Sequence, residues 1–448
     1  MSQLYAGFGR VNVTPMLGIG LGGYFKIRKA EAVLDELELN ALALGCGDTR
    51  VVMLSMDHLG IRQSLAERYR NHISECTGIP ADAVYIHCTH THTGPYLLED
   101  STDPLVQEYI QTVYHKMADA AVAAVQNMKP AKMGYAVGEA PNIAFVRRFR
   151  MKDGSIKTNP GVNNPDIVAP IGDVDERVSV VRFDQEGGES LVLVNFADHP
   201  DTVGGNKISC DWPGFLRRTV EQALDNTRCI FFNGAQGDVN HVNVHPTGGY
   251  LNDMFMDFDD VARGYGHARF MGRVVAGGVL QVYDKVKYVD VDSIAYTQKL
   301  LQIPSNMPDP ADMPEAHRIN DLHNAGKDSE IPYEGMMLTT VVAEAGRMVR
   351  LEHGPESFPL LLSAIRMGDV VFSGIPGEPF TGIGRGIKAA KGWELVVPTC
   401  LTNGSQGYFP MKEAYDEGGY EARSSNFKAG VAELIIDEAT KLIETLRR

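Results

Sequence analysis

The sequence has little of what marks cross-linked or membrane-spanning proteins. Its six cysteines are scattered along 448 residues, and none belongs to a C-x-x-C pair. This argues against a thiolate zinc site and against a dense disulfide framework. We therefore expect free, mostly buried thiols in a reducing cytosol. No apolar run reaches the roughly 18–20 residues that span a bilayer. The first residues show no basic stretch followed by an apolar one, so we predict no secretory signal.

Positive charge is also scarce. The 42 lysines and arginines are outnumbered by 57 acidic residues, which gives a formal net charge of −15. This balance argues against a nucleic-acid partner and against stable association with an anionic membrane surface. We predict a cytoplasmic protein whose partner is a small-molecule substrate. A homo-oligomer is compatible with the sequence, which fixes no oligomeric state.

Strand-like and helix-like patterns alternate along the chain, whose hydrophobic content of 44% and charged content of 22% are ordinary for a globular protein. Strands are expected at residues 51–57, 83–88, 177–184, 190–197 and 229–233, and helices at 62–78, 103–128 and 427–448. A further pair of strands over 360–378 has a Gly-Asp hairpin turn at Gly368. These patterns predict an α/β fold with mixed β-sheets flanked by helices and with antiparallel hairpins.

The best candidate for a domain boundary is the segment rich in proline and aspartate from Pro304 to Pro314. Residues suited to catalysis lie on both sides of it, however, and no internal repeat is visible. We therefore predict a single catalytic domain over residues 1–448, with an inserted loop at about residues 304–335.

Polar side chains follow several of the strand-like runs. They are Asp57, His90, His92, His199, Asp238 and Glu378. In open α/β sheets, ligands bind beyond the carboxyl ends of the strands. These side chains would therefore share one crevice if their strands are neighbours, which the sequence does not show.

The stretch "THTHTGP" carries two imidazoles, His90 and His92, which face the same side if the segment is extended. His90, His199 and Glu378 would make a catalytic zinc site of two nitrogens and one carboxylate, with a position left for water. Zinc lowers the pKa of such a water to roughly 7. The alternative, that these are hydrogen-bonded structural histidines in polar loops, remains open from these residues alone.

Six short motifs, taken in order, resemble the N-terminal catalytic region of the neutral/alkaline (non-lysosomal) ceramidase family. They are "GFGRVNVTP", "THTHTGP", "NFADHP", "GAQGDV", "IPGEPFT" and "NGSQGYFPMKEAYDEGGYEA". Each motif is short, but their common order makes the set specific. The resemblance extends from about residue 5 to about residue 425.

The resemblance implies a zinc hydrolase that cleaves an amide and has a ceramidase catalytic-domain-like fold. At 448 residues, we expect the chain to lack the C-terminal immunoglobulin-like domain of the long ceramidases. Carried over by position, the metal ligands are His90, His199, Glu378 and Tyr408, and the catalytic residues are His92, Arg147 and Tyr420. One departure is Gly234, which stands where the family has a serine before the Gly-Asp turn.

The roles implied for the catalytic residues agree with their chemistry. Arg147 stays protonated and, with Tyr420, would stabilise the oxyanion of a tetrahedral intermediate. His92 would assist proton transfer. Zinc-bound water would attack the carbonyl of an amide, or of an ester or lactone, in a small polar substrate. One zinc ion per chain is expected.

The residues assigned to substrate binding are Asp57, Asp238 and His241. Asp57 or Asp198 would also hold the second nitrogen of a ligating imidazole. The sequence further permits a second metal at His92, Asp57 or Asp211, and manganese, iron or cobalt in place of zinc. Two other functions remain open. One is a metal-dependent lyase or isomerase acting on a sugar- or cyclitol-like substrate, and the other is a binding protein with a structural zinc.

Overall fold

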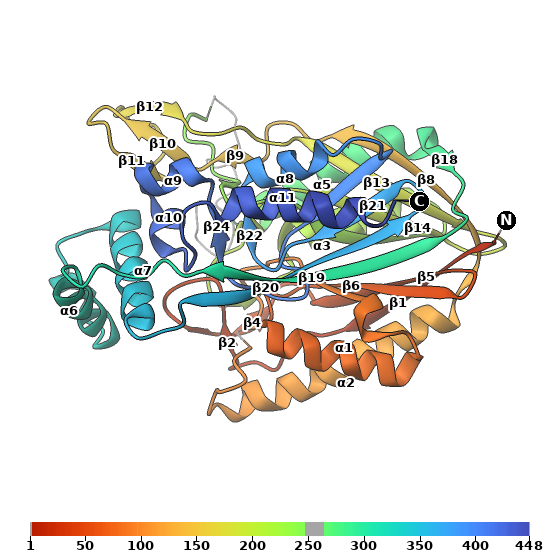
Figure 1. The fold of residues 1–448 in the computed structure, drawn as a ribbon, viewed down its shortest axis with the longest axis horizontal. Coiled ribbons are helices and arrows are strands. Elements are labelled where there is room, and N and C mark those ends of the chain that lie inside the picture. Colours follow the sequence, from red (N-terminus) through yellow and green to blue (C-terminus); the bar gives the residue numbers. More distant parts are fainter. Residues whose placement is uncertain (1, 96, 247–263, 448) are drawn as a thin grey trace.

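A large mixed β-sheet forms the centre of the protein in the computed structural model, which describes residues 2–95, 97–246 and 264–447 (Figure 1). From edge to edge its strands are β16 (Thr227–Asn233), β14 (Ser190–Phe196), β13 (Arg177–Gln185), β8 (Lys129–Glu139), β1 (Leu4–Asn12), β5 (Glu38–Cys46), β6 (Thr49–Met56) and β7 (Val84–Cys88), and β18 (Lys287–Val289) also pairs with β8. The outermost pairs, β14–β16 and β6–β7, are parallel. The inner neighbours along this path run antiparallel.

A second sheet packs behind the first. Its strands, in spatial order, are β19 (Ile294–Pro304), β20 (Ser357–Met367), β21 (Val370–Gly374) and β23 (Leu395–Thr399). The predicted hairpin between β20 and β21 is confirmed, with Gly368 in the left-handed region at φ 57°. Side chains such as Ile365 and Phe372 join the hydrophobic core of the large sheet. Strands β5 and β6 are thus covered on both faces, which explains their nearly continuous apolar sequences.

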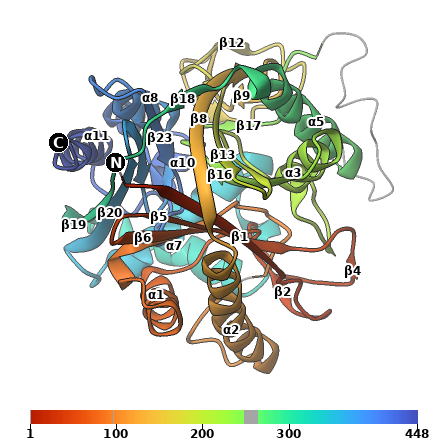
Figure 2. The ribbon, with the colours of Figure 1, turned by 90° about the vertical axis from the view of Figure 1, so that its right-hand side faces the viewer.

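Helices cover the outer faces of the two sheets (Figure 2). Their bounds are α1 (Gln63–Thr77), α2 (Pro104–Gln126), α3 (Asp211–Ala223), α5 (Tyr265–Val282), α8 (Thr381–Lys388), α9 (Lys412–Glu417), α10 (Tyr420–Ser424) and α11 (Val431–Glu444). Helix α2 packs on β1 and β5, α3 on β16, α5 on β8 and β13, and α8 and α11 on the second sheet. The predicted fold class, mixed sheets flanked by helices, is confirmed.

The ends of the first two helices follow ordinary capping chemistry. Helix α1 ends at Gly78, whose φ of 72° is a left-handed C-cap. At the start of α2, the Asp103 carboxylate accepts a hydrogen bond from the backbone of Leu105, and Pro104 occupies the first turn. These capping residues made both helices predictable from the sequence.

The segment predicted as an inserted loop at 304–335 includes a helix. It contains α6 (Met313–Asn324) and the 3-10 turn η3 (Asp328–Glu330), and α7 (Gly335–Leu351) follows. The prolines end near residue 314, and apolar residues then recur at helical spacing, as in Met313, Ala316 and Ile319. These side chains pack against α7 in a small hydrophobic core of their own at one end of the molecule (Figure 1).

Short strands and turns complete the described chain. The strands are β2 (Gly20–Leu21), β3 (Arg28–Lys29), β4 (Ala32–Val33), β9 (Phe145–Val146), β10 (Arg148–Met151), β11 (Ile156–Thr158), β12 (Ile167–Pro170), β15 (Lys207–Ile208), β17 (Val239–Asn240), β22 (Glu378–Pro379) and β24 (Tyr408–Phe409), and the 3-10 turns are η1 (Ala81–Ala83) and η2 (Tyr283–Lys285). All six cysteines are free, as predicted, and Cys76 is the one exposed. Among the described helices, none has the length and apolarity to cross a bilayer.

Candidate metal centre

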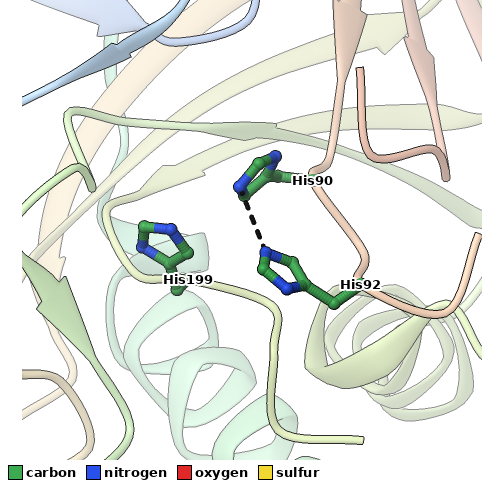
Figure 3. A group of neighbouring side chains, drawn as sticks. All are labelled: His90, His92 and His199. Carbon is green, nitrogen blue, oxygen red and sulfur yellow. Dashed lines mark hydrogen bonds between the residues drawn. The ribbon is translucent and has the colours of Figure 1, made fainter. Parts of the chain in front are cut away.

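Three histidines from two distant loops meet at the ends of the strands (Figure 3). His90 and His92 follow β7, and His199 follows β14. All three side chains are buried, and each offers a ring nitrogen within 4.8 Å of the others. The arrangement can hold a metal ion.

The two loops meet because the large sheet curls until its edge strands touch. Strands β7 and β16 lie at opposite ends of the strand order, yet the backbone N–H of Asn233 in β16 donates to Nε2 of His87 in β7 over 2.9 Å. The Asn233 side chain then donates to the backbone oxygens of Thr89 and Asp198. Asn233 thereby joins the two loops directly beside the histidines.

Backbone carbonyls fix the orientation of two of the imidazoles. Nδ1 of His90 donates to the backbone oxygen of Leu59 over 2.7 Å. Nδ1 of His199 lies 2.8 Å from the backbone oxygen of Gln236 and 3.0 Å from that of Val239. Because a carbonyl only accepts, the proton of each neutral ring sits on Nδ1 and the lone pair is on Nε2. His90 reaches its place with a left-handed backbone, at φ 78°.

These lone pairs point at the carboxylate of Glu378. Its Oε2 lies 3.2 Å from Nε2 of His90 and 3.2 Å from Nε2 of His199, and Nε2 of His92 lies 3.3 Å from that of His90. Two ligand atoms about 2.1 Å from a tetrahedral zinc ion stand about 3.4 Å apart. The spacing and the N/O donor set therefore fit a zinc-like ion.

The charges around the centre favour neutral rings at His92 and His199 and an ionised carboxylate at Glu378. Burial and the nearby Arg147 lower the pKa of His199, and burial and His90 hold the pKa of His92 well below its usual range. Burial alone would lower the pKa of His90, but Glu378 raises it. The pKa of Glu378 is held well below its usual range, although burial opposes this, because His90 and His199 face it.

His92 is held differently from the other two imidazoles. Its ring lies under Gly23, where an added Cβ would come within 2.7 Å of Cγ and Nδ1, and Gly23 has a φ of 95°. The Arg28 guanidinium donates to the backbone oxygen of His92 over 2.6 Å. In the described part of the chain, Nδ1 of His92 has no hydrogen-bond partner. No carbonyl therefore holds this ring as one holds each of the other two.

Tyr408 and Arg147 lie against the centre on the side of Glu378. Tyr408 is the register partner of Glu378 between β24 and β22, and its ring lies 6.4 Å from that of His199. The Arg147 guanidinium stacks 5.3 Å from the Tyr408 ring centroid and donates to the backbone oxygen of Gly237. Its Nε lies 2.7 Å from the buried carboxylate of Glu421.

Three adjoining cavities reach this cluster. One of about 440 Å³ is lined by His90, His92 and Glu378. A second of about 540 Å³ is lined by His92, Arg147 and Asp201. The third, of about 980 Å³, passes Glu378 between α1 and the α6–α7 helices. All three share Phe25, Tyr408 and Tyr420 as wall residues, so they meet at one point beside the histidines.

Phe25 joins the N-terminal part of the chain to the helical insertion. Its ring stands edge-on to Tyr420 at 6.2 Å and to His323 of α6 at 6.4 Å. The neighbouring Lys26 lies 3.4 Å from the Asp328 carboxylate. The insertion therefore forms part of the roof over the cavities.

Two of the predicted positions prove to be structural. Asp57 is fully buried, and Arg217 of α3 donates to both its oxygens over 2.6 and 2.9 Å. It anchors β6 below the histidine loop and does not line the three cavities, although the sequence assigns it to substrate binding. Nor do Asp57 and Asp198 hold the imidazoles. Asp198 accepts from the backbone of His199, and the rings bind carbonyls.

Asp238 and His241 also lie outside the cavity walls. Both oxygens of Asp238 accept from Thr381, one from its backbone and one from its hydroxyl, at the first turn of α8. It therefore positions the chain just after Glu378. His241 is buried and donates from Nδ1 to Asp201 over 3.0 Å. Gly234 does not line the three cavities, so its missing hydroxyl lies away from them.

Sequence reasoning missed several residues of the site. The carbonyls that hold the imidazoles, those of Leu59 and Gln236, leave no side-chain signal. Asp201 and Glu421 each stand beside a predicted site residue, in "DHPD" and "YEA". The available signal was that each of these acidic residues lies close in the sequence to a predicted ligand or catalytic residue.

No protein-family model and no curated protein matches this sequence. Among solved structures, the fold is similar to that of neutral ceramidase from Pseudomonas aeruginosa, with a TM-score of 0.72 and 18% identity over 99% of this chain and 75% of that one. It is also similar to a ceramidase complexed with C2, with a TM-score of 0.72 and 17% identity over 99% of this chain and 76% of that one. These matches confirm the resemblance at the level of the fold.

Proposed function

We propose that the chain is a metal-dependent hydrolase, with zinc as the metal, that cleaves an amide bond in a small polar substrate. An ester or lactone would use the same machinery, because all three pass through a tetrahedral oxyanion. The observation that carries the proposal is the convergence of two tautomer-fixed Nε2 atoms, those of His90 and His199, on one oxygen of Glu378. With neutral rings these lone pairs face the carboxylate, an arrangement that a bound metal ion stabilises.

His90, His199 and Glu378 are the residues that fit a resident ion best. In His90 and His199, Nδ1 is hydrogen-bonded to a backbone carbonyl. Such a bond is the usual support for a ligating histidine. Tyr408, the neighbour of Glu378 across β22 and β24, is the proposed fourth ligand. A zinc ion supplies Lewis acidity and a water whose pKa is lowered to about 7.

His92 is the proposed proton-transfer residue. Its Nε2 lies within the cluster, 3.3 Å from that of His90, while its Nδ1 is not engaged by a described residue. An imidazole with one unengaged nitrogen can take up a proton and release it to the leaving group. His92 also lines two of the cavities, so it is within reach of a bound substrate.

Arg147 and Tyr420 are the proposed oxyanion-stabilising groups. Both line the cavity beside His92, and Arg147 is buried and oriented by Glu421 and Gly237. A preoriented cation in a water-poor site stabilises developing negative charge strongly. Tyr420 would donate its phenolic hydroxyl at neutral pH, since burial raises its pKa above the ordinary value.

The cavities support a compact substrate. Volumes of about 440 and 540 Å³ next to the histidines are in the range that holds small molecules. Their polar wall residues include Arg147, Asp201 and Asp328. The substrate partner, the absence of nucleic-acid and membrane partners, and a cytoplasmic location remain parts of this proposal.

The test is turnover of a panel of small amides, esters and lactones by the metal-loaded enzyme in ¹⁸O-labelled water. Hydrolysis places one solvent oxygen in the product carboxylate, and the His92→Ala and His199→Ala variants should lose turnover. A lyase or isomerase would convert a sugar- or cyclitol-like substrate without that label. No labelled product from any member of the panel would contradict the proposal.

A further inference from the structure

Phe25 stands at the junction of the three cavities. It lines all of them, as do Tyr408 and Tyr420. The two tyrosines have proposed roles at the metal centre, whereas Phe25 has none. A side chain that is shared by the walls of neighbouring cavities lies between them. Phe25 therefore separates the cavities beside the histidines from the largest one.

The two smaller cavities, of about 440 and 540 Å³, form one chamber around His92. Their walls share Gly23, Tyr24 and His92 in addition to the three aromatic residues at the junction. The cavity of about 980 Å³ is a groove that continues beyond Phe25 as far as Phe427, and His92 does not line it. A substrate held at His92 therefore has to pass Phe25 before any part of it enters the groove.

The ring of Phe25 is held in place without being buried. It stands edge-on to Tyr420 on one side and to His323 on the other. The next residue, Lys26, lies 3.4 Å from the Asp328 carboxylate, which His323 engages over 2.8 Å. The ring nevertheless stays partly exposed. It is therefore fixed in position at the junction and free to contact a bound molecule.

We propose that Phe25 sets the size limit of the substrate by closing the chamber off from the groove. The residue contacts the substrate but takes no part in bond making or breaking, so it determines specificity. This inference deepens the proposed function and rests on it for the placement of the reacting group at the metal centre.

Truncation of the ring should join the chamber to the groove. Phe25→Ala leaves an opening between Tyr420 and His323, the two rings that Phe25 contacts. The space left by a truncated apolar side chain can itself hold a small aromatic ligand. The variant should therefore accept a second ring where the wild type presents a steric clash.

The test measures the binding of three hydroxamates to the full-length, zinc-loaded chain by isothermal titration calorimetry. Acetohydroxamate, benzohydroxamate and 4-phenylbenzohydroxamate chelate a metal through the same two oxygens. They differ in the attached group, which is a methyl, a single ring or a pair of rings. The binding of such a chelator requires the metal centre but not its catalytic activity.

The expected effect is a change in the size limit. In the wild type, 4-phenylbenzohydroxamate should bind at least about tenfold more weakly than benzohydroxamate. In Phe25→Ala it should bind at least about tenfold more tightly than in the wild type, while the dissociation constant of acetohydroxamate stays within about threefold. Phe25→Leu, a milder truncation that keeps an apolar side chain, should give a smaller gain.

Tyr333→Ala is the matched control. Tyr333 is an aromatic residue with nearly the same exposure as Phe25, 43% against 45%, but it lines none of the three cavities. Its truncation should leave all three affinities unchanged. Circular dichroism melting curves and zinc content establish that each variant is folded and loaded.

An unchanged ratio of the 4-phenylbenzohydroxamate and acetohydroxamate dissociation constants in Phe25→Ala and Phe25→Leu would overturn the inference. So would an equal gain in Tyr333→Ala, or a wild type that binds 4-phenylbenzohydroxamate as tightly as benzohydroxamate. Absence of hydroxamate binding by every form would contradict the metal centre and, with it, the inference.

The panel of amides, esters and lactones, assayed in parallel, separates the two proposals. A gain in affinity in Phe25→Ala without turnover of any member of the panel contradicts the proposed function alone. Turnover by the wild type together with an unchanged size limit in Phe25→Ala contradicts the role of Phe25 alone.

Discussion

Glu378 and Tyr408 are register partners in the short parallel pair of β22 and β24. Thirty positions apart in the sequence, they are brought together because the backbone N–H of Glu378 donates to Gly407 and that of Phe380 donates to Phe409. The carboxylate that faces His90 and His199 is therefore tied to the phenol that faces Arg147. A shift of either strand would move both groups at once.

The close approach of Gly23 to His92 gives a first prediction. In Gly23→Ala the new Cβ would lie 2.7 Å from the imidazole, so we expect kcat/KM to fall about tenfold or more as His92 is displaced. Gly161→Ala is the matched control, since Gly161 has a similar φ of 101° but no atom within 4 Å of an added Cβ. An equal fall of kcat/KM in both variants would show that the close approach of Gly23 to His92 does not matter for catalysis.

The ion pair of Glu421 with Arg147 gives a second prediction. Glu421 is fully buried, and its carboxylate lies 2.7 Å from Nε of Arg147. In Glu421→Gln the guanidinium loses its anionic partner, and we expect kcat to fall about 10- to 100-fold through misplacement of Arg147. Metal content, measured by mass spectrometry, should not change. Loss of the metal would instead indicate a general collapse of the site.

The assignment of Asp57 as a structural residue is tested by stability. Asp57→Asn leaves the Arg217 guanidinium buried with a weaker set of partners, Glu38 at 3.2 Å among them. Breaking a buried pair from one side costs about 3–5 kcal/mol, which urea denaturation would detect. The exposed pair of Arg447 with Glu444 is the control. Glu444→Gln should change the free energy of unfolding by about 0.5 kcal/mol or less.

Asp175 gives a prediction of pH dependence. Burial alone would raise its pKa, but hydrogen bonds from Arg177 and the charge of Lys388 lower it below its usual range. A carboxyl group with a depressed pKa stabilises the fold above its unfolded pKa of about 3.9 and loses that contribution as the pH falls. Asp175→Asn should therefore lower the free energy of unfolding by about 1–3 kcal/mol at pH 7.

The difference between wild type and Asp175→Asn should shrink as the pH falls below about 4. Urea unfolding at a series of pH values measures it. Asp173→Asn, two residues away and 83% exposed, is the control and should have little effect at any pH. A constant difference down to pH 3 would show that Asp175 acts through packing and not through its charge.

Some of the site was readable from the sequence because strand ends carry a local signal. His90, His199 and Glu378 each follow an apolar run, and the structure brings them together. What the sequence could not show is that the sheet curls until β7 meets β16 at Asn233 and His87. That closure depends on contacts about 145 positions apart, for which no local pattern exists.

Two residues assigned to substrate binding, Asp57 and Asp238, lie outside the three cavities for a common physical reason. Asp57 and Asp238 also follow strands, but Arg217 and Thr381, which engage them, lie over 140 positions further along the chain. The sequence gives the end of a strand and not the partner that a side chain meets there. The helical insertion was missed for a different reason, since the prolines before Met313 concealed the helical spacing that follows.

Metal analysis of single histidine variants tests the central claim most directly. After loading with zinc and removal of excess metal, we expect about one ion per chain in the wild type and in His92→Ala. His90→Ala and His199→Ala should bind far less. Zinc retained in full by His90→Ala and His199→Ala, or absent from the wild type, would contradict a metal centre built on these residues.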